Sequence, residues 1–121
     1  MIVAESHGNR LTAYDIGQNG DLGNRRTWAD AGEDHPDGIY VDAKGAIWYA
    51  DVANHIACGC ARTAKCSRRS SWTEGAFACT LSRGDQPQLY VVGQEFGGPE
   101  AAESTGQVVA LPLPAPGAGH P

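Results

Sequence analysis

The sequence lacks the features that would place a protein at a membrane or on nucleic acid. None of its 121 residues lies in an apolar run long enough to span a bilayer. Met1 leads directly into strand-like residues, without the basic region and long apolar stretch of a signal peptide, so we expect a cytoplasmic protein. A basic excess is also missing, since 9 Lys and Arg face 14 Asp and Glu. The resulting net charge of −5 disfavours a phosphate-backbone partner. We expect neither a membrane nor a nucleic acid as partner.

The cysteines are few, and they lack the spacing of a zinc site. Three of the four lie between Ala57 and Glu74, at Cys58, Cys60 and Cys66. Structural zinc sites use cysteine and histidine pairs at characteristic spacings, and no histidine follows these cysteines at the usual interval. A small cysteine–metal module is one alternative interpretation of this segment, but we expect no bound zinc.

One segment has the pattern of a β-hairpin. Residues 39–42 (Ile-Tyr-Val-Asp) alternate with a period of two, which predicts a short strand. Residues 42–45 (Asp-Ala-Lys-Gly) have turn chemistry, because the glycine adopts positive φ at little cost. Residues 47–49 (Ile-Trp-Tyr) then predict a second apolar, aromatic strand.

An acidic residue stands at the start of this hairpin. Asp37 lies between Pro36 and Gly38, and a carboxylate fixed by such neighbours can face a ligand. Pro-Asp-Gly between apolar runs is also a common turn signal, so Asp37 has a structural explanation beside the functional one. The neighbouring His35 is expected to be an exposed residue rather than a ligand.

A degenerate repeat suggests the fold. Short apolar strands begin at Ile2, Ile47 and Leu89, which are 45 and 42 positions apart. A repeat of roughly 40–50 residues made of short strands is typical of propeller blades. We predict an all-β fold over residues 1–111, a partial propeller with about two to three blades of four-stranded antiparallel sheet. The Pro/Gly-rich residues 112–121 are predicted to form an extended tail.

A collinear set of motifs identifies the family. These motifs are residues 1–16 (MIVAESHGNRLTAYDI), 25–30 (RRTWAD), 36–51 (PDGIYVDAKGAIWYAD), 77–79 (FAC), 89–92 (LYVV) and 106–110 (GQVVA). With them the chain resembles the SMP-30/gluconolactonase/LRE-like family, whose members are six-bladed β-propellers. At about 45 residues per blade the chain supplies fewer than three blades, so the resemblance is to the C-terminal part of the family pattern.

The resemblance implies a chemistry. Enzymes of this family hydrolyse small sugar lactones with a divalent metal, held by a Glu, an Asn and the Asp of a Pro-Asp-Gly motif. Asp37 matches the last of these, so it is the candidate metal ligand and the candidate catalytic residue, which helps to activate the attacking water. Oxygen ligands suit calcium or magnesium, and zinc is the other candidate. The Glu and Asn-Gly motifs are absent from this sequence, so we expect an incomplete site and no activity from the isolated chain.

A non-catalytic interpretation stands beside the enzymatic one. A partial propeller has open sheet edges, which are templates for pairing with another chain. The chain would then be inert or would bind a partner, including a second copy, through those edges. In either case we expect Trp28, Trp48 and Tyr49 to fill space between blades.

Residues 57–74 are atypical, because they lack the alternation of a strand. One hypothesis is that this segment is translated out of frame. Back-translation with G/C-rich codons, read from the third base, gives VRVREDGEVLQTVELDR, which is two alternating strands around an Asp-Gly turn. Genomic sequencing of the codons for residues 57–74 tests this hypothesis.

Overall fold

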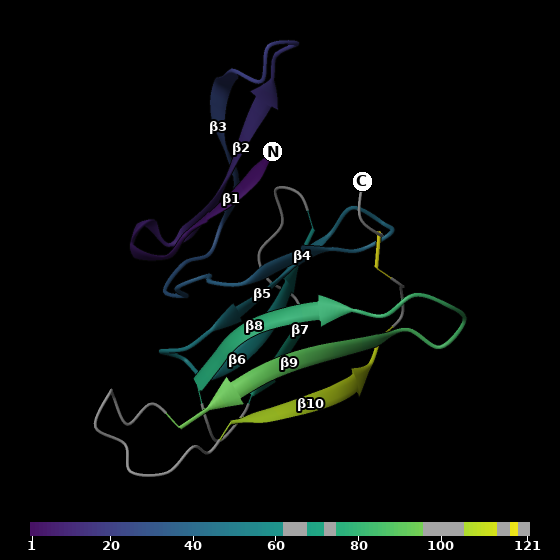
Figure 1. Cartoon of the computed structure of the whole chain (residues 1–121). Coiled ribbons are helices and arrows are strands. Elements are labelled where there is room, and N and C mark those ends of the chain that lie inside the picture. The colour runs from purple at the N-terminus through teal and green to yellow at the C-terminus, as the bar shows by residue number, and fades with distance from the viewer. Residues whose placement is uncertain (62–67, 72–74, 96–105, 114–116, 119–121) are drawn as a thin grey trace.

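The structure, a computed structural model, describes residues 1–61, 68–71, 75–95, 106–113 and 117–118 (Figure 1). Over these residues the protein is all-β, with ten strands in three antiparallel sheets, so the predicted fold class is confirmed. Nowhere in the described part does a helix have the length and apolar character needed to cross a membrane.

The first sheet comes from the N-terminal residues and has the strand order β1-β2-β3. Each strand pairs with the next in sequence, and a short 3-10 helix makes the first connection. The elements are β1 (Ile2–Glu5), η1 (Ser6–Gly8), β2 (Arg10–Ile16) and β3 (Leu22–Asp30).

The other two sheets follow in the same up-and-down manner. The middle sheet has the order β4-β5-β6-β7 and the last sheet the order β10-β9-β8. The middle sheet consists of β4 (Ile39–Val41), β5 (Ile47–Asp51), β6 (Ile56–Cys60) and β7 (Arg68–Ser71). The last sheet consists of β8 (Gly75–Leu81), β9 (Gln88–Gln94) and β10 (Gln107–Pro112). Among the described residues, only the middle sheet has the four strands predicted for a blade.

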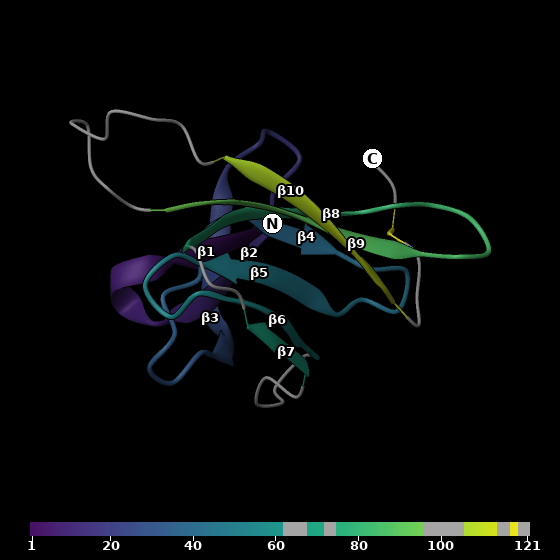
Figure 2. The same ribbon diagram turned by 90° about the horizontal axis from the view of Figure 1, so that it is seen from below.

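The middle sheet is apolar on both faces and packs between the other two. All five residues of β5 are buried, and the four before Asp51 alternate between two apolar clusters. Ile47 and Tyr49 face a cluster with Leu11 of the first sheet, whereas Trp48 faces a cluster with Leu89 of the last sheet. Figure 2 shows the last sheet as a layer over the middle one. Full burial of such side chains contributes roughly 1.5–3 kcal/mol each, which holds the three layers together.

The aromatic residues occupy the predicted positions between sheets. Tyr49 and Trp48 are 0% and 5% exposed on opposite faces of β5, and Trp28 packs against the cluster that contains Tyr49. Gly59 lies under Trp48, and a Cβ placed there would come within 2.9 Å of the indole ring. This contact explains why β6 has a glycine inside a strand.

The predicted hairpin is confirmed. β4 and β5 pair in antiparallel register, and Gly45 in the turn has φ +80°. The carboxylate of Asp42 organises the turn, because its Oδ1 accepts the backbone N–H groups of Lys44 and Ala46 at 2.9 Å each. Its Oδ2 accepts the indole N–H of Trp48 at 3.2 Å. These bonds satisfy a side chain that is only 6% exposed.

Residues 57–74 lack the alternation of a strand in sequence, yet part of the segment lies in strands in the described structure. Ile56–Cys60 forms β6 and Arg68–Ser71 forms β7. Strand β6 is buried although its residues are small, because both faces of the middle sheet are covered. The out-of-frame hypothesis stays a prediction, since a hairpin at this place fits either frame.

The described C-terminal residues pair with or hydrogen-bond to the middle and last sheets. The predicted tail begins at Pro112, which is the last residue of β10. Further on, Gly117 forms an isolated bridge with Asp42, and its N–H donates to the carbonyl of Ser82 at 2.9 Å. The N–H of Ala118 donates to the carbonyl of Val41 at 3.0 Å. These residues therefore connect β4 with the turn that follows β8.

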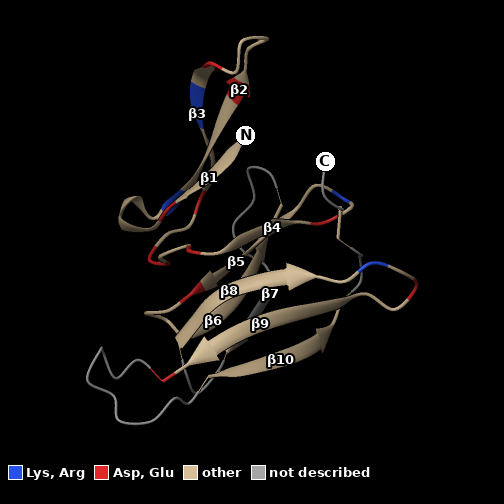
Figure 3. Cartoon of the chain, viewed as in Figure 1, with Lys and Arg blue, Asp and Glu red and all other residues tan. Residues whose placement is uncertain are grey.

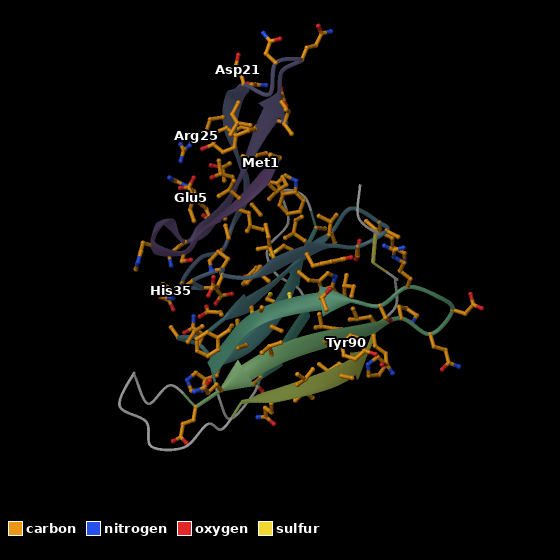
Figure 4. All side chains as sticks on the ribbon, viewed as in Figure 1. Met1, Glu5, Asp21, Arg25, His35 and Tyr90 are labelled. Atoms are coloured by element: carbon orange, nitrogen blue, oxygen red, sulfur yellow. The ribbon has the colours of Figure 1, made fainter. Side chains whose placement is uncertain are left out.

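Charged side chains gather on the first sheet, as Figure 3 shows. Glu5 is the centre of this cluster and lies beside Arg25 in Figure 4. Its Oε1 accepts the hydroxyl of Thr12 at 2.6 Å and Nη2 of Arg25 at 2.7 Å. Its Oε2 accepts Nε of Arg10 at 2.8 Å. The hydrogen bond from Thr12, followed by that from Arg10, lowers the pKa of Glu5 to about 2.

We expect the Glu5→Gln variant to unfold at a lower temperature than the native chain at pH 7. Because folding lowers the pKa of Glu5 from 4.5 to about 2, its stabilisation is present above pH 4.5 and is lost as the pH falls to 2. The difference in melting temperature should therefore shrink between pH 4.5 and pH 2. Thermal denaturation at several pH values measures this, with Glu33→Gln as an exposed control. A difference independent of pH would contradict the assignment.

Candidate functional site

The four residues His35–Gly38 are fixed where the three sheets meet. The backbone N–H of His35 donates to Oδ2 of Asp51 at 2.7 Å, at the end of β5. The hydroxyl of Ser6, in the helix after β1, donates to the carbonyl of Pro36 at 2.7 Å. The first half of this segment is thus held by the first and middle sheets.

The second half is held by the middle and last sheets. The N–H of Asp37 donates to the carbonyl of Ala50 at 2.9 Å, and the N–H of Ala50 donates to the carbonyl of Gly38 at 3.0 Å. The N–H of Gly38 donates to the carbonyl of Phe77 in β8 at 3.2 Å. The backbone of Asp37 is therefore anchored on both sides. A side chain that must stay in one place to contact a ligand needs such an anchor.

Asp37 opens onto a pocket at this junction. The pocket has a volume of about 490 Å³ and is open to solvent on one side. Loops from the first and middle sheets form its walls, and His35 is labelled beside them in Figure 4. The lining residues are Ser6, His7, His35, Asp37, Val52, Ala53 and His55.

Three carboxylates lie in this region, and they differ in their surroundings. Asp51 is 0% exposed and Asp34 is 2% exposed. Asp34 accepts the hydroxyl of Tyr49 at 2.7 Å, and Asp51 accepts Nδ2 of Asn54 at 2.8 Å. Burial, together with this hydrogen bond to Asp34, raises the pKa of Tyr49 above its usual value, so the hydroxyl stays protonated. Asp37 is exposed and has no side-chain hydrogen bond to another described residue, so its carboxylate is available to a ligand.

Three histidines lie around the same pocket, which the sequence did not indicate. The side chain of His35 is 44% exposed, and its Nδ1 lies 4.0 Å from Oδ2 of Asp51. His7 and His55 are exposed, and His55 has the positive φ of +55°. They come from separate loops, and only the folded arrangement brings them together.

The described residues around the pocket do not form a complete metal centre. Among the described residues, no three His, Cys, Asp or Glu side chains are close enough together to hold a metal ion. Catalytic metals need several ligands in a fixed geometry, and Asp34 and Asp51 are occupied by internal hydrogen bonds. Asp37 alone is a partial ligand set, so a metal of the kind that the family resemblance implies would need further ligands beside it.

The cysteines belong to the core. Cys58 and Cys60 are 0% exposed in the cluster between the first and middle sheets. Cys79 is 8% exposed, and burial raises the pKa of its thiol to about 12. Cys66 lies outside the described residues. A thiolate metal module at Cys58 and Cys60 has no support in the described part of the chain.

The backbone at Gly38, just before β4, lies so close to β8 that it leaves no room for a side chain. A Cβ placed there would lie 2.7 Å from the Cα of Ala78 and 2.9 Å from the carbonyl oxygen of Phe77. Both atoms belong to the backbone of β8, so neither can move aside alone. The small residue after Asp37 thus lets the middle and last sheets meet directly beneath the pocket.

We expect Gly38→Ala to lower the free energy of unfolding by about 1–3 kcal/mol, because backbone atoms must shift to admit the methyl group. Gly23→Ala is the control, since a Cβ there has no atom within 4 Å. Urea denaturation of the native chain and the two variants measures the difference. Equal stability of the three proteins would show that the sheets do not meet at Gly38.

A solved structure shows the same architecture. It is titled "Luciferin-regenerating enzyme solved by SIRAS using XFEL (refined against Hg derivative data)", and it is similar to this chain with a TM-score of 0.78. The match covers 97% of this chain and 42% of that chain, at 14% sequence identity. At this identity the likeness shows the fold alone, and the fold is part of a β-propeller, as predicted.

The family is shown by the sequence itself. A comparison with curated proteins gives no match. The family model described as SMP-30/Gluconolactonase/LRE-like region matches residues 1–94, which include both walls of the pocket and Asp37. The chain therefore belongs to the SMP-30/gluconolactonase/LRE-like family.

Proposed function

We propose that this chain carries part of the active site of a metal-dependent sugar-lactone hydrolase, with Asp37 as its catalytic carboxylate. One observation supports this more than any other. Asp37 is exposed in a pocket while its backbone N–H is bonded to Ala50, whereas Asp34 and Asp51 nearby are buried and occupied. A carboxylate that is fixed but not satisfied by the protein suits contact with a ligand.

Hydrolysis of a lactone needs a group that accepts a proton from the attacking water. Water attacks the carbonyl carbon, the ring C–O bond breaks, and the product is a hydroxy acid. Asp37 would accept a proton from the attacking water and return it to the ring oxygen as the C–O bond breaks, which regenerates the carboxylate. When bound, a divalent cation polarises such a carbonyl and stabilises the oxyanion. Calcium, magnesium and zinc stay candidates, and each would need ligands beyond Asp37.

Binding of a divalent cation at Asp37 can be measured directly. We expect Mn²⁺, used as a paramagnetic probe, to broaden the amide signals of Gly38 and Ala50 with a dissociation constant on the order of 1 mM or weaker, because one carboxylate is a poor site. Asp37→Asn should abolish the broadening. Asp21→Asn is the matched control, because Asp21 is exposed and lies at the far tip of the first sheet (Figure 4).

The same samples test the activity. We expect no turnover of an aldonolactone by the isolated chain, because the described residues do not form a complete metal centre. Turnover that is sensitive to EDTA and absent in Asp37→Asn would show that the site is complete after all. Broadening that persists in Asp37→Asn would contradict the role of Asp37.

A second candidate function is binding through the last sheet. The strands β8, β9 and β10 contain no charged residue, and Figure 3 shows them without charge. Val92 and Val108 are direct neighbours across β9 and β10, and they are 47% and 67% exposed. Paired apolar side chains on an open sheet are typical of a surface that another protein covers.

This second function predicts association that depends on those valines. Sedimentation velocity of the native chain over a range of concentrations should show species larger than the monomer, because apolar sheet faces and open edges attract one another. Val108→Lys should shift the distribution toward the monomer. Val41→Lys is the control, since Val41 is 38% exposed and belongs to β4 of the middle sheet. A native chain that is monomeric at all concentrations would exclude self-association.

A cytoplasmic location is also part of the proposal. Fractionation of cells that express the tagged chain tests it, and recovery from the culture medium would contradict it.

A further inference from the structure

Asp51 is a buried carboxylate whose hydrogen bonds join the two walls of the pocket. It is the last residue of β5 and is 0% exposed. Its Oδ2 accepts the backbone N–H of His35 at 2.7 Å, in the wall that carries Asp37. Its Oδ1 accepts the backbone N–H of Asn54 at 3.0 Å, in the turn after β5 whose neighbouring residues line the pocket.

The side chain of Asn54 reinforces this connection. Its Nδ2 donates to Oδ2 of Asp51 at 2.8 Å, and also to the carbonyl of Glu33 at 3.2 Å. The same nitrogen lies 3.4 Å from Oδ1 of Asp34, which in turn accepts the hydroxyl of Tyr49. One amide therefore links the turn after β5 to the segment before β4.

We propose that Asp51, together with Asn54, is a positioning pair that sets the place of Asp37 in the pocket. The inference rests on the proposed role of Asp37 at this site. Asp51 does not face the pocket, since its carboxylate is turned inward onto backbone N–H groups. It acts through the segment that begins at His35 and reaches Asp37 two residues later.

The negative charge of Asp51 suits this task. A carboxylate offers only acceptors, and all three donors that it meets here are N–H groups. Hydrogen bonds to a charged partner are shorter and stronger than neutral ones, so they hold a loop more firmly. An asparagine in the same place would turn an NH₂ group toward one of these donors, so at least one of the hydrogen bonds that join the two segments would be lost.

Asp42 provides a matched control in the same hairpin. It is also buried, at 6% exposed, and its carboxylate also accepts three N–H groups, from Lys44, Ala46 and Trp48. It precedes β5, whereas Asp51 ends that strand, and its carboxylate bonds to Lys44, Ala46 and Trp48 and not to His35. Asp42→Asn thus causes a comparable loss of buried hydrogen bonds away from the pocket.

Amide hydrogen exchange distinguishes local positioning from a general loss of stability. The informative N–H groups are those of Asp37 and Gly38, because their acceptors are Ala50 and Phe77 and not the substituted residue. In Asp51→Asn we expect their exchange to accelerate at least about tenfold more than that of the β9 amides, because local opening is then decoupled from global unfolding. In Asp42→Asn the two groups of amides should accelerate by the same factor.

A second measurement follows the side chain itself. Three-bond couplings give the χ1 populations of Asp37, and we expect one dominant rotamer in the native chain and in Asp42→Asn but averaging in Asp51→Asn. Equal effects of the two substitutions on exchange and on χ1 would overturn the positioning role. Neither readout needs a bound cation or turnover. Failure of the Mn²⁺ or lactone experiments would therefore count against the proposed function, and these two measurements would still decide the inference.

Discussion

The burial of strand β5 on both faces is the constraint on which the structure depends. A strand whose five residues are all buried needs a layer on each side, and the chain supplies these layers as the first and last sheets. The large residues Tyr49 and Trp48 point to opposite clusters, so neither neighbouring sheet can be removed without exposing one of them. The segment before β4 lies where all three layers meet, and this position makes its geometry rigid.

Rigidity at that junction comes from hydrogen bonds to the buried carboxylates and to the backbone of the segment before β4. Asp34 and Asp51 are buried with donors on their oxygens, as buried charges must be. Asp37 lies between them in sequence, its backbone is equally well held, and its side chain faces solvent in the pocket. The buried carboxylates of Asp34 and Asp51 stabilise the loops, whereas the exposed carboxylate of Asp37 is available to a ligand.

The sequence predicted some of this arrangement, and physical reasons explain the rest. The hairpin of β4 and β5 was predictable because alternation and turn chemistry are local, and Asp37 was found by its family motif. The roles of Asp51 and Asn54 were not predictable. An acidic residue at the end of a strand has the same sequence pattern whether it binds a ligand or a backbone N–H. Strand β6 was missed for a related reason. Its cysteines, alanine and glycine carry no alternation, and they form a strand because the layers around them exclude water.

The two candidate functions involve parts of the molecule that differ in charge. The first sheet carries the network around Glu5, whereas the strands of the last sheet carry no charge at all. A network of ion pairs stays solvated at little cost, but exposed valines such as Val92 and Val108 gain from being covered. The pocket lies toward the charged side, lined by loops of the first and middle sheets. Covering the apolar face of the last sheet would therefore leave the opening beside Asp37 accessible, so binding there and chemistry at the pocket do not exclude each other.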